Sequence, residues 1–205
     1  MRRKIIITMT AFLSVAIMYG KEPVSDFKRI TFGAEWGYVA SIHCGLHHNF
    51  FSDIGYRVDM RSHEIAYISN GDVYVHLGCN VNHNWNLSLY TGIAGVYDLH
   101  KIVPVSLRAT RYLNPSPKGD RWFLFLDGGS GLSLTSHPQA TANGKLGAGY
   151  RISLSPATKL DFSISYRMTL THPTVEYDGY IVDISRVNRN NGYVSGIALS
   201  MSLTL

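Results

Sequence analysis

The chain of 205 residues is long enough for one domain, and only 16% of its residues are charged. Its formal charge is +5, but Arg2, Arg3 and Lys4 supply three of these charges, so +2 remains beyond them. There is no cluster of lysines and arginines, no basic helix and no zinc pattern, which excludes a nucleic-acid partner.

The first twenty residues predict a secretory signal peptide. MRRK is a basic start, IIITMTAFLSVAIMYG is an apolar run, and Gly20 is a small residue suited to precede the cut. The alternative, a single transmembrane helix, fits less well because the run is short and polar sequence follows at once. We therefore expect residues 1–20 to be removed and residues 21–205 to form the folded domain.

Beyond residue 20 the hydrophobic pattern has a period of two. Apolar and small or polar residues alternate in segments separated by turn residues, and no stretch keeps a helical period. These segments predict about eight strands: residues 31–46, 72–82, 85–98, 101–113, 121–135, 144–155, 159–171 and 192–205.

The non-apolar side of these strands decides between a soluble and a membrane fold. In a soluble barrel or sandwich this side would meet water and carry many charges. Here it is mostly Gly, Ser, Ala and Thr, which suits a crowded interior. An apolar outer band around a polar interior predicts an all-β fold, an antiparallel transmembrane β-barrel. A soluble periplasmic barrel is the alternative.

A few charged residues share the face that this pattern assigns to the interior. Isolated charges would be costly there, but a hydrogen-bonded ion-pair network would be much less so. The expected network consists of Glu35, Arg108, Arg121, Asp127, Lys145, Arg151, Asp161 and Arg167.

The lengths of the connections predict the topology. Short turns belong on the periplasmic side, which places NHN, NPSPKGD and SPAT there and makes residues 45–71 and 172–190 extracellular. The Asn70-Gly71 hairpin signal, with alternation from Ile54 to Met60, and the segment VEYDGYIVDI leave a ten-strand barrel open. We favour eight strands, with both segments as strand extensions or hairpins above the membrane. In the first segment Phe50, Phe51, Tyr56 and Arg57 form an exposed recognition patch or pack within the loop.

The two cysteines lie on the apolar side of their expected strands. An exported chain meets an oxidising compartment, so Cys44 and Cys79 could pair. If Cys44 lies near the top of the first strand and Cys79 near the bottom of the second, they are too far apart to bridge.

The segments GAGYRISLSPATKLDFSISYRMTLTHP and NWNLSLYTGIAGVYD carry a family resemblance. The layout resembles the small outer-membrane β-barrel proteins of Gram-negative bacteria, especially functionally uncharacterised ones of the Bacteroides group. The resemblance implies insertion by the barrel-assembly machinery, which reads an apolar final strand. The corresponding residues are Tyr193, Leu199, Met201, Leu203 and Leu205, the last standing where an aromatic residue is usual.

Two chemical functions are alternatives to this interpretation. His43, His47, His48 and His63 are the densest histidine group, but on a strand positions i and i+4 lie roughly 13 Å apart, so we expect neither a metal nor another cofactor. A lipid hydrolase would need a serine and a histidine within hydrogen-bond reach. Candidates exist, although no G-x-S-x-G motif does: Ser130, Ser133, Ser136, His137 and His172.

An eight-stranded barrel is filled by its own side chains. The sequence therefore predicts a monomeric, non-enzymatic outer-membrane protein with a plugged interior and a structural or surface-binding role through its two long loops. Its expected partners are outer-membrane lipid, lipopolysaccharide and the assembly machinery, and its extracellular ligand is not indicated. The alternatives are a lipid-modifying enzyme and a narrow channel for small solutes.

Overall fold

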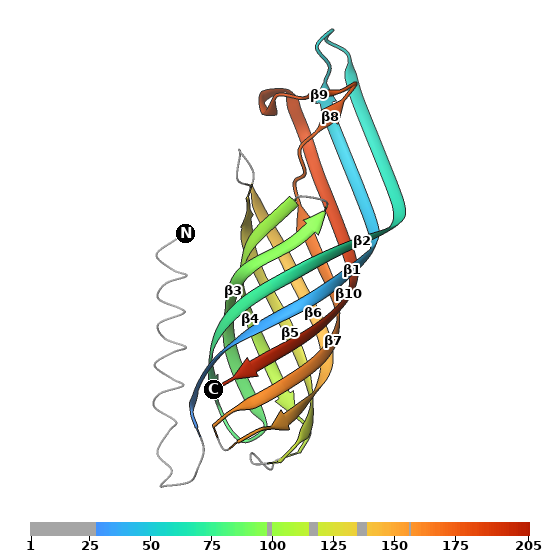
Figure 1. Ribbon diagram of the computed structural model, residues 1–205. Helices are drawn as coiled ribbons and strands as arrows, with labels where there is room; N and C mark the ends of the chain where they lie inside the picture. The colour runs from blue at the N-terminus through green and yellow to red at the C-terminus, as the bar shows by residue number, and fades with distance from the viewer. Residues whose placement is uncertain (1–27, 98–99, 115–118, 135–138, 156) are drawn as a thin grey trace, which may run out of the picture.

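The computed structural model describes residues 28–97, 100–114, 119–134, 139–155 and 157–205 (Figure 1). The expected signal peptide lies outside these residues. No helix in the described part of the chain is long and apolar enough to cross a membrane.

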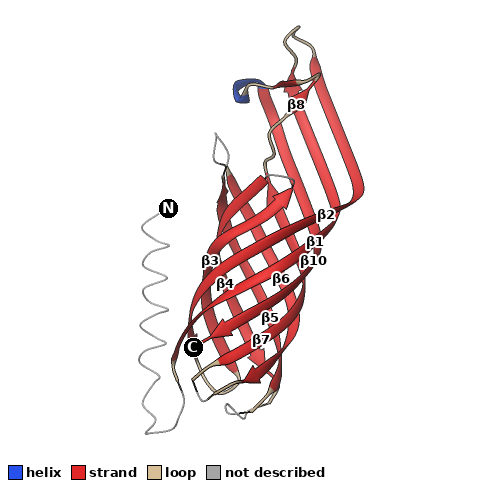
Figure 2. Ribbon diagram, in the orientation of Figure 1, coloured by secondary structure: helices blue, strands red, loops and turns tan. Residues whose placement is uncertain are grey.

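Within the described residues, eight strands close into one antiparallel barrel in the order β1-β10-β7-β6-β5-β4-β3-β2 (Figures 1 and 2). This confirms the all-β fold and the eight-strand prediction, and the ten-strand alternative is wrong. The bounds are β1 (Ile30–Phe51), β2 (Arg57–Asn80), β3 (Trp85–Tyr97), β4 (His100–Tyr112), β5 (Arg121–Ser133), β6 (Ala140–Ser153), β7 (Lys159–Thr171) and β10 (Val187–Thr204).

The outward face of the barrel is a continuous apolar belt. Along β7 the outward side chains run without a break from Leu160 to Leu170, about 25 Å in height for a strand tilted by roughly 40°. A soluble monomer rarely exposes apolar patches above a few hundred Å². Other exposed apolar residues of the belt are Phe32, Trp36, Val73, Val75, Leu77, Leu89, Ile93, Val105, Leu107, Leu124, Leu126, Leu146, Ile197 and Leu199.

Strands β1, β2 and β10 continue beyond the rim of the barrel and stand above it as a three-stranded sheet (Figure 1). We call residues 43–51, 57–65 and 187–195 the projecting sheet. Strand β3 pairs with β2 only up to Asp72, and β7 pairs with β10 only up to Gly192, so residues 57–65 and 187–191 form two open edges of the projecting sheet.

The long connection between β7 and β10 folds against the tip of the projecting sheet. It contains a two-residue hairpin, β8 (Glu176–Tyr177) and β9 (Tyr180–Ile181), and a short 3-10 helix, η1 (Ile184–Arg186). Asp178 and Gly179 both have positive φ, as the tightest hairpin turns require. The VEYDGYIVDI segment is therefore a hairpin above the barrel and not a ninth crossing.

The Asn70-Gly71 hairpin signal is wrong, because both residues lie within β2 and pair with Val39 and Tyr38. Strand β1 offers β2 an unbroken partner on this side, so the chain has no reason to reverse. The Asn70 side chain instead donates to the carbonyl oxygen of Val96, 3.3 Å away, where the β2–β3 ladder has ended.

A β-bulge separates the barrel from the projecting sheet. Ser41 pairs with Gly196 and His43 with Ser195, which leaves Ile42 as an extra residue of β1 opposite β10. Opposite β2 the extra residue lies in the other strand, since Ser41 pairs with Ile68 and His43 with Ile65. Ile42 and His43 consequently both face outward, and Cys44 is buried. The expectation that Cys44 lies on the apolar, outward side of its strand is wrong, because a bulge reverses the alternation after it.

The register also separates the cysteines. Cys79 pairs with Ile30 at one end of β1, whereas Cys44 pairs with Glu64 in the projecting sheet. Cys44 packs inside the upper barrel against Val96, Ile102 and Val194. The two cysteines therefore lie at different heights along β1 and β2, and they are too far apart to form a disulfide.

Candidate functional site: the lumen and the projecting sheet

Six charged residues form a chain of alternating acids and bases inside the barrel. Arg108 makes two hydrogen bonds to Glu35, of 2.5 and 3.1 Å, and binds Asp127 at 3.0 Å. Lys145 Nζ lies 3.6 Å from Glu35 and 3.1 Å from Asp72. Arg167 lies 3.6 Å from Asp72 and ends the chain. All six side chains are buried, and three acids balance three bases.

This lumen chain crosses the barrel instead of following its wall. Glu35 on β1 and Arg108 on β4 are three strands apart around the barrel, and Asp72 on β2 and Lys145 on β6 are four strands apart. Four of eight is the largest separation that a closed barrel allows. The Lys145–Asp72 pair therefore spans the lumen.

Aromatic rings line the lumen chain and complete its packing. The Arg108 guanidinium carbon lies 3.9 Å from the centre of the Tyr90 ring and 4.5 Å from that of Phe125, and Lys145 Nζ lies 4.2 Å from that of Tyr74. Contacts of this kind stabilise a cation that has been removed from water. The ring of Phe125 occupies the space beside Gly147, where a Cβ atom would collide with it.

Arg121, Arg151 and Asp161 form a separate group nearer the short turns. Arg151 binds Asp161 through two hydrogen bonds of 2.7 and 2.6 Å. Arg121 donates to the His83 carbonyl oxygen at 2.8 Å, and the guanidinium carbons of Arg121 and Arg151 lie 3.7 and 4.6 Å from the centre of the Tyr112 ring. The eight expected residues all lie inside the barrel, but they form two groups.

Asp72 is the member of the lumen chain that sequence reasoning missed. Its side chain is completely buried and joins Lys145 to Arg167. The signal was present, since Asp72 stands two and four residues before Tyr74 and His76 on the same inward face. The predicted strand of residues 72–82 begins at Asp72, and a charged residue at a strand end gives no sign of an inward position.

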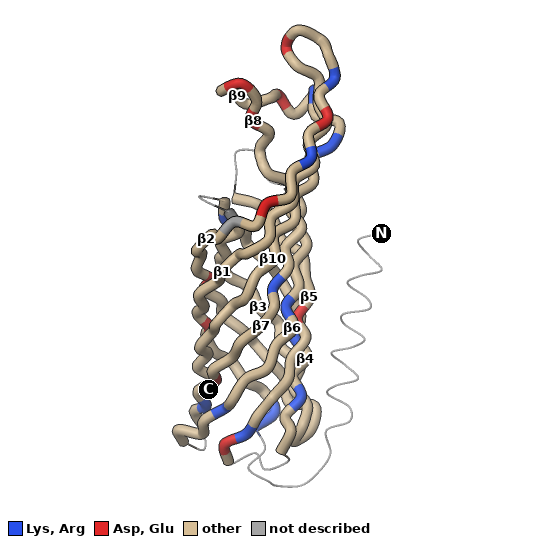
Figure 3. The backbone as a smooth tube through the Cα atoms, turned by 90° about the vertical axis from the view of Figure 1, so that its right-hand side faces the viewer, with Lys and Arg blue, Asp and Glu red and all other residues tan. Residues whose placement is uncertain are grey.

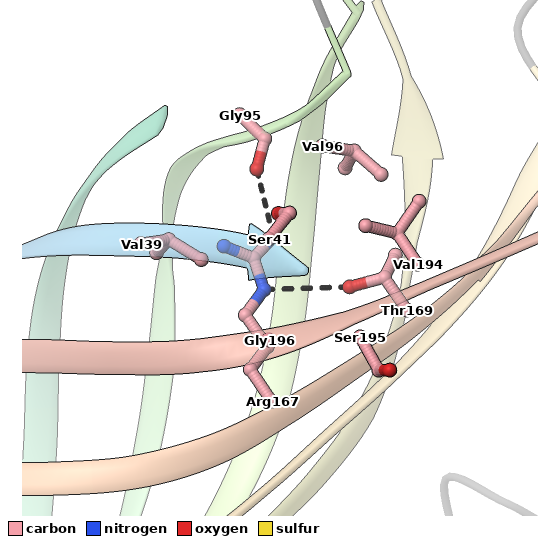
Figure 4. Close-up of a pocket in the computed structure, with 9 residues that line it drawn as sticks. All are labelled: Val39, Ser41, Gly95, Val96, Arg167, Thr169, Val194, Ser195 and Gly196. Carbon is pink, nitrogen blue, oxygen red and sulfur yellow. Dashed lines mark hydrogen bonds between the residues drawn. The ribbon is translucent and has the colours of Figure 1, made fainter. Parts of the chain in front are cut away.

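Little open space remains around these groups. Towards the projecting sheet, Arg167 fills the lumen, donating to the Gly95 carbonyl oxygen at 3.1 Å and to Thr169 Oγ1 at 3.3 Å (Figure 4). Between the two charged groups, a cavity lined by His76, Tyr90 and Arg151 leaves about 20 Å³ for the centres of water molecules. That is room for about one water.

The tip of the projecting sheet has its own small apolar core. Phe50 is completely buried against Val175 and Val182, and its ring meets Tyr177 edge to face at 5.3 Å. Phe50 therefore cannot belong to an exposed recognition patch. It holds the β7–β10 connection against β1, because Val175 and Val182 of that connection pack on its side chain.

The other three residues expected in a recognition patch lie on the surface. Phe51 and Tyr56 are 43% and 46% exposed, and Arg57 Nε donates to Asn49 Oδ1 at 3.0 Å. The Tyr56 hydroxyl lies 3.1 Å from that of Tyr177 and raises the pKa of Tyr177 to about 12. The ion pair between Arg186 and Asp53 joins the same two loops. Further exposed apolar residues of this tip are Ile54, Ile181 and Ile184.

Three histidines of the projecting sheet contact other protein groups. His47 Nε2 lies 2.8 Å from Asp59 Oδ1, and this hydrogen bond lowers the pKa of Asp59. His43 stacks on the ring of Tyr193 at 5.8 Å, and His63 Nδ1 lies 3.2 Å from the Tyr193 hydroxyl. Across the described residues, no group of three or more metal-ligating side chains is placed to hold an ion.

The serine and histidine candidates for a hydrolase are spread over different surroundings. Ser130 is exposed on the outer face of β5, whereas Ser133 is buried and accepts a hydrogen bond from the Gln139 amide at 2.9 Å. His172 Nδ1 lies 3.0 Å from the Ala140 carbonyl oxygen. Ser136 and His137 lie outside the described residues.

The apolar side chains of the final strand lie along the seam that closes the barrel. Leu199, Met201 and Leu203 pair with Tyr38, Trp36 and Ala34 of β1. Leu205 completes the seam through two backbone hydrogen bonds to Phe32, of 2.8 and 3.3 Å. Tyr193 lies at the base of the projecting sheet.

No protein-family model and no curated protein matches the sequence. Among solved structures, the outer membrane protein OprG from Pseudomonas aeruginosa aligns with a TM-score of 0.55 and 9% identity, over 89% of this chain and 99% of that one. The two chains share a fold. Neisserial surface protein A aligns with a TM-score of 0.49 and 11% identity, over 90% of this chain and 99% of that one.

Proposed function

We propose that this protein is an exported, non-enzymatic outer-membrane β-barrel with a plugged lumen, which uses its projecting sheet to bind a partner at the cell surface. The apolar belt supports the membrane placement, because its height of about 25 Å matches that of outer-membrane barrels. The shared fold with OprG supports the same placement.

The lumen chain carries the proposal that the barrel is plugged. A solute would have to separate ion pairs that are buried and span the barrel, such as Lys145–Asp72. Breaking a buried pair leaves an uncompensated charge and costs about 3–5 kcal/mol.

Conductance in planar bilayers tests the plug. We expect no steady conductance steps from the wild-type protein. The double variant Glu35→Ala, Arg108→Ala should conduct, since it removes one acid and one base from the middle of the lumen and leaves its net charge unchanged. Steady steps from the wild type would instead support the narrow channel.

Fractionation of cells and heat-modifiable migration test the placement. We expect the folded protein in the outer-membrane fraction, migrating differently before and after boiling. A protein that stays soluble after export would exclude the membrane barrel.

The exposed apolar tip supports the surface-binding role. Ile54 is 85% exposed and Ile181 is 68% exposed, on a sheet that stands above the barrel. We expect cells that display the protein to partition more strongly into hexadecane, and Ile54→Ser with Ile181→Ser to reverse this. Glu176→Ser, an exposed polar position in the same tip, is the matched control. Equal partitioning of wild type and double variant would exclude an apolar contact surface there.

A further inference from the structure

The apolar belt ends at the same level on the three strands of the projecting sheet. Its last outward residues are Ile42 on β1, Ile65 on β2 and Tyr193 on β10. The next outward side chains along the sheet are polar. The base of the projecting sheet thus lies where hydrocarbon gives way to lipid headgroups, if the barrel spans the membrane as proposed.

The outward face above this level is basic. The register arranges its side chains in successive rows: His63, Gly45 and Tyr193, then Arg61, His47 and Asn191, then Asp59, Asn49 and Arg189. Arg57 lies above them, so three arginines stand against one carboxylate, which His47 already binds. We call Arg57, Arg61, Arg189, His43, His47 and His63 the basic face; Figure 3 shows its arginines in blue along the projecting strands.

The opposite face of the same strands carries no arginine or lysine among residues 43–51, 57–65 and 187–195. Its side chains include Leu46, Phe50, Val58 and Met60, together with Glu64. The positive charge is therefore confined to the face that continues the lipid-facing wall of the barrel. Charge on a water-exposed sheet that served only solubility would not need this asymmetry.

Gly45 gives the basic face its shape. A Cβ atom at this position would collide with the Tyr193 ring, which lies across the glycine between His43 and His63. The hydrogen bond to His63 holds the Tyr193 hydroxyl at the polar end of the belt. Tyrosines in this position anchor barrels at the membrane interface.

We infer that the basic face binds the phosphate groups of an anionic glycolipid in the outer leaflet. Arg61 lies four residues above Ile65, roughly 13 Å along the strand, within reach of headgroup phosphates and their first sugars. Exposed arginines bind phosphate through paired N–H groups. A lipid is favoured over a soluble polyanion because the face rises directly from the belt, so that a bound lipid keeps its acyl chains against Ile42 and Ile65. The inference rests on the proposed membrane placement.

Binding of purified lipopolysaccharide to the refolded, full-length mature barrel in nanodiscs tests this inference. We expect Arg61→Gln with Arg189→Gln to weaken binding roughly thirtyfold, since each arginine near an anionic surface contributes about fivefold in affinity. Arg111→Gln is the matched control. Arg111 is exposed on the outer wall near the short-turn end of β4, at the end of the barrel away from the projecting sheet. Enzymatic removal of the lipid phosphates should weaken wild-type binding to the level of the double variant.

Three results of direct binding would overturn the inference. They are equal binding by the double variant and the wild type, equal binding of phosphorylated and dephosphorylated lipid, and a loss in Arg111→Gln as large as that in the double variant. Heat-modifiable migration of each variant shows that it is folded. Inorganic phosphate that competes as well as the lipid would indicate a site for free anions and would also overturn it. The plug and the membrane placement have tests of their own. A failure of the lipid-binding inference can therefore be distinguished from a failure of either proposal.

Discussion

At the residue scale, the six buried ionic groups of the lumen chain are tolerated because each has a partner of opposite charge. Asp72 is the clearest case, since its carboxylate contacts both Lys145 and Arg167 and is closed to solvent. Asp53 offers a contrast, because its ion pair with Arg186 lies on the exposed tip. An aspartate should therefore contribute much more to the free energy of unfolding at position 72 than at position 53.

We expect Asp72→Asn to lower the free energy of unfolding by about 3–5 kcal/mol, because it leaves the buried Arg167 without the acid that it contacts and Lys145 with Glu35 alone. Asp53→Asn, which removes an exposed pair, should change it by less than about 1 kcal/mol. Urea titration of the barrel in lipid vesicles measures both. Similar values for the two variants would show that the lumen chain does not carry this energy.

Acid should loosen the projecting sheet through His48. Burial lowers the pKa of His48 below its usual 6.5, and its Nε2 lacks a hydrogen-bond partner among the described residues. The folded state then binds a proton less readily than the unfolded state, so stability is complete above about pH 6.5 and falls as the pH drops through it. The pair of Asp59 and His47 acts in a lower window, because the pKa of Asp59 lies below 3.8.

Hydrogen exchange of residues 43–51, corrected for the intrinsic rate, measures this effect. Between about pH 7.5 and about pH 5, protection in the wild type should fall. His48→Gln cannot titrate and should reduce the loss, whereas an undiminished loss in that variant would assign the acid response to another group.

At the element scale, strands that belong to one barrel serve two different environments. The bulge at Ile42 lets β1 leave the barrel wall while β2 and β10 keep their own alternation. Beyond it, adjacent residues of β1 have opposite roles. Phe50 is closed to solvent beneath the β7–β10 connection, and Phe51 is 43% exposed on the other face.

We expect Phe50→Ala to release the β7–β10 connection without unfolding the barrel, because the contacts of Phe50 with Val175 and Val182 lie outside the wall. Limited proteolysis should cut within residues 172–190 at least several times faster, while heat-modifiable migration is kept. Phe51→Ala is the control and should leave the cleavage rate unchanged. Loss of the heat-modifiable form in Phe50→Ala would show that the tip core supports the whole barrel.

At the scale of the whole molecule, stability depends on a single seam between the first and the last strand. Strand β10 pairs with β1 from Gly33–Thr204 upwards, and the Leu205–Phe32 hydrogen bonds finish the seam at the short-turn end. A closed barrel has no unpaired edges within the apolar layer, which is what a membrane requires. The apolar residues at the end of β10 are therefore needed to close the barrel.

We expect deletion of Met201–Leu205 to abolish the heat-modifiable folded form in lipid vesicles, because β1 and β7 would each lose backbone partners inside the belt. Deletion of residues 176–181 removes a hairpin of similar size above the barrel and should leave folding intact. If the first deletion folds as well as the second, closure does not depend on the seam.

The sequence predicted the barrel wall well, because period-two alternation is a local property. The bounds of β7 agree with the structure to the residue, and β3, β4 and β5 agree within two residues. Strand β6 begins four residues earlier than predicted, and the larger errors are in β1, β2 and β10, which the structure extends into the projecting sheet. There the exposed Arg57 and Asp59 weaken the alternation, and Asn70-Gly71 imitates a turn.

The inward position of the eight charged residues follows from the alternation along each strand. Their partners do not follow from it. Lys145 and Asp72 are 73 positions apart in the sequence and meet only because the barrel closes. Phe50 likewise gains its burial from a segment more than a hundred residues later.

The sequence by itself thus determined the alternating strands of the wall, the apolar belt and the polar lumen, since each depends on neighbouring residues in one strand. Only the tertiary structure decided which charges meet across the lumen, where the bulge reverses β1, and that three strands rise above the rim with their basic side outward. Those features depend on register and closure, which bring together residues that no local pattern connects.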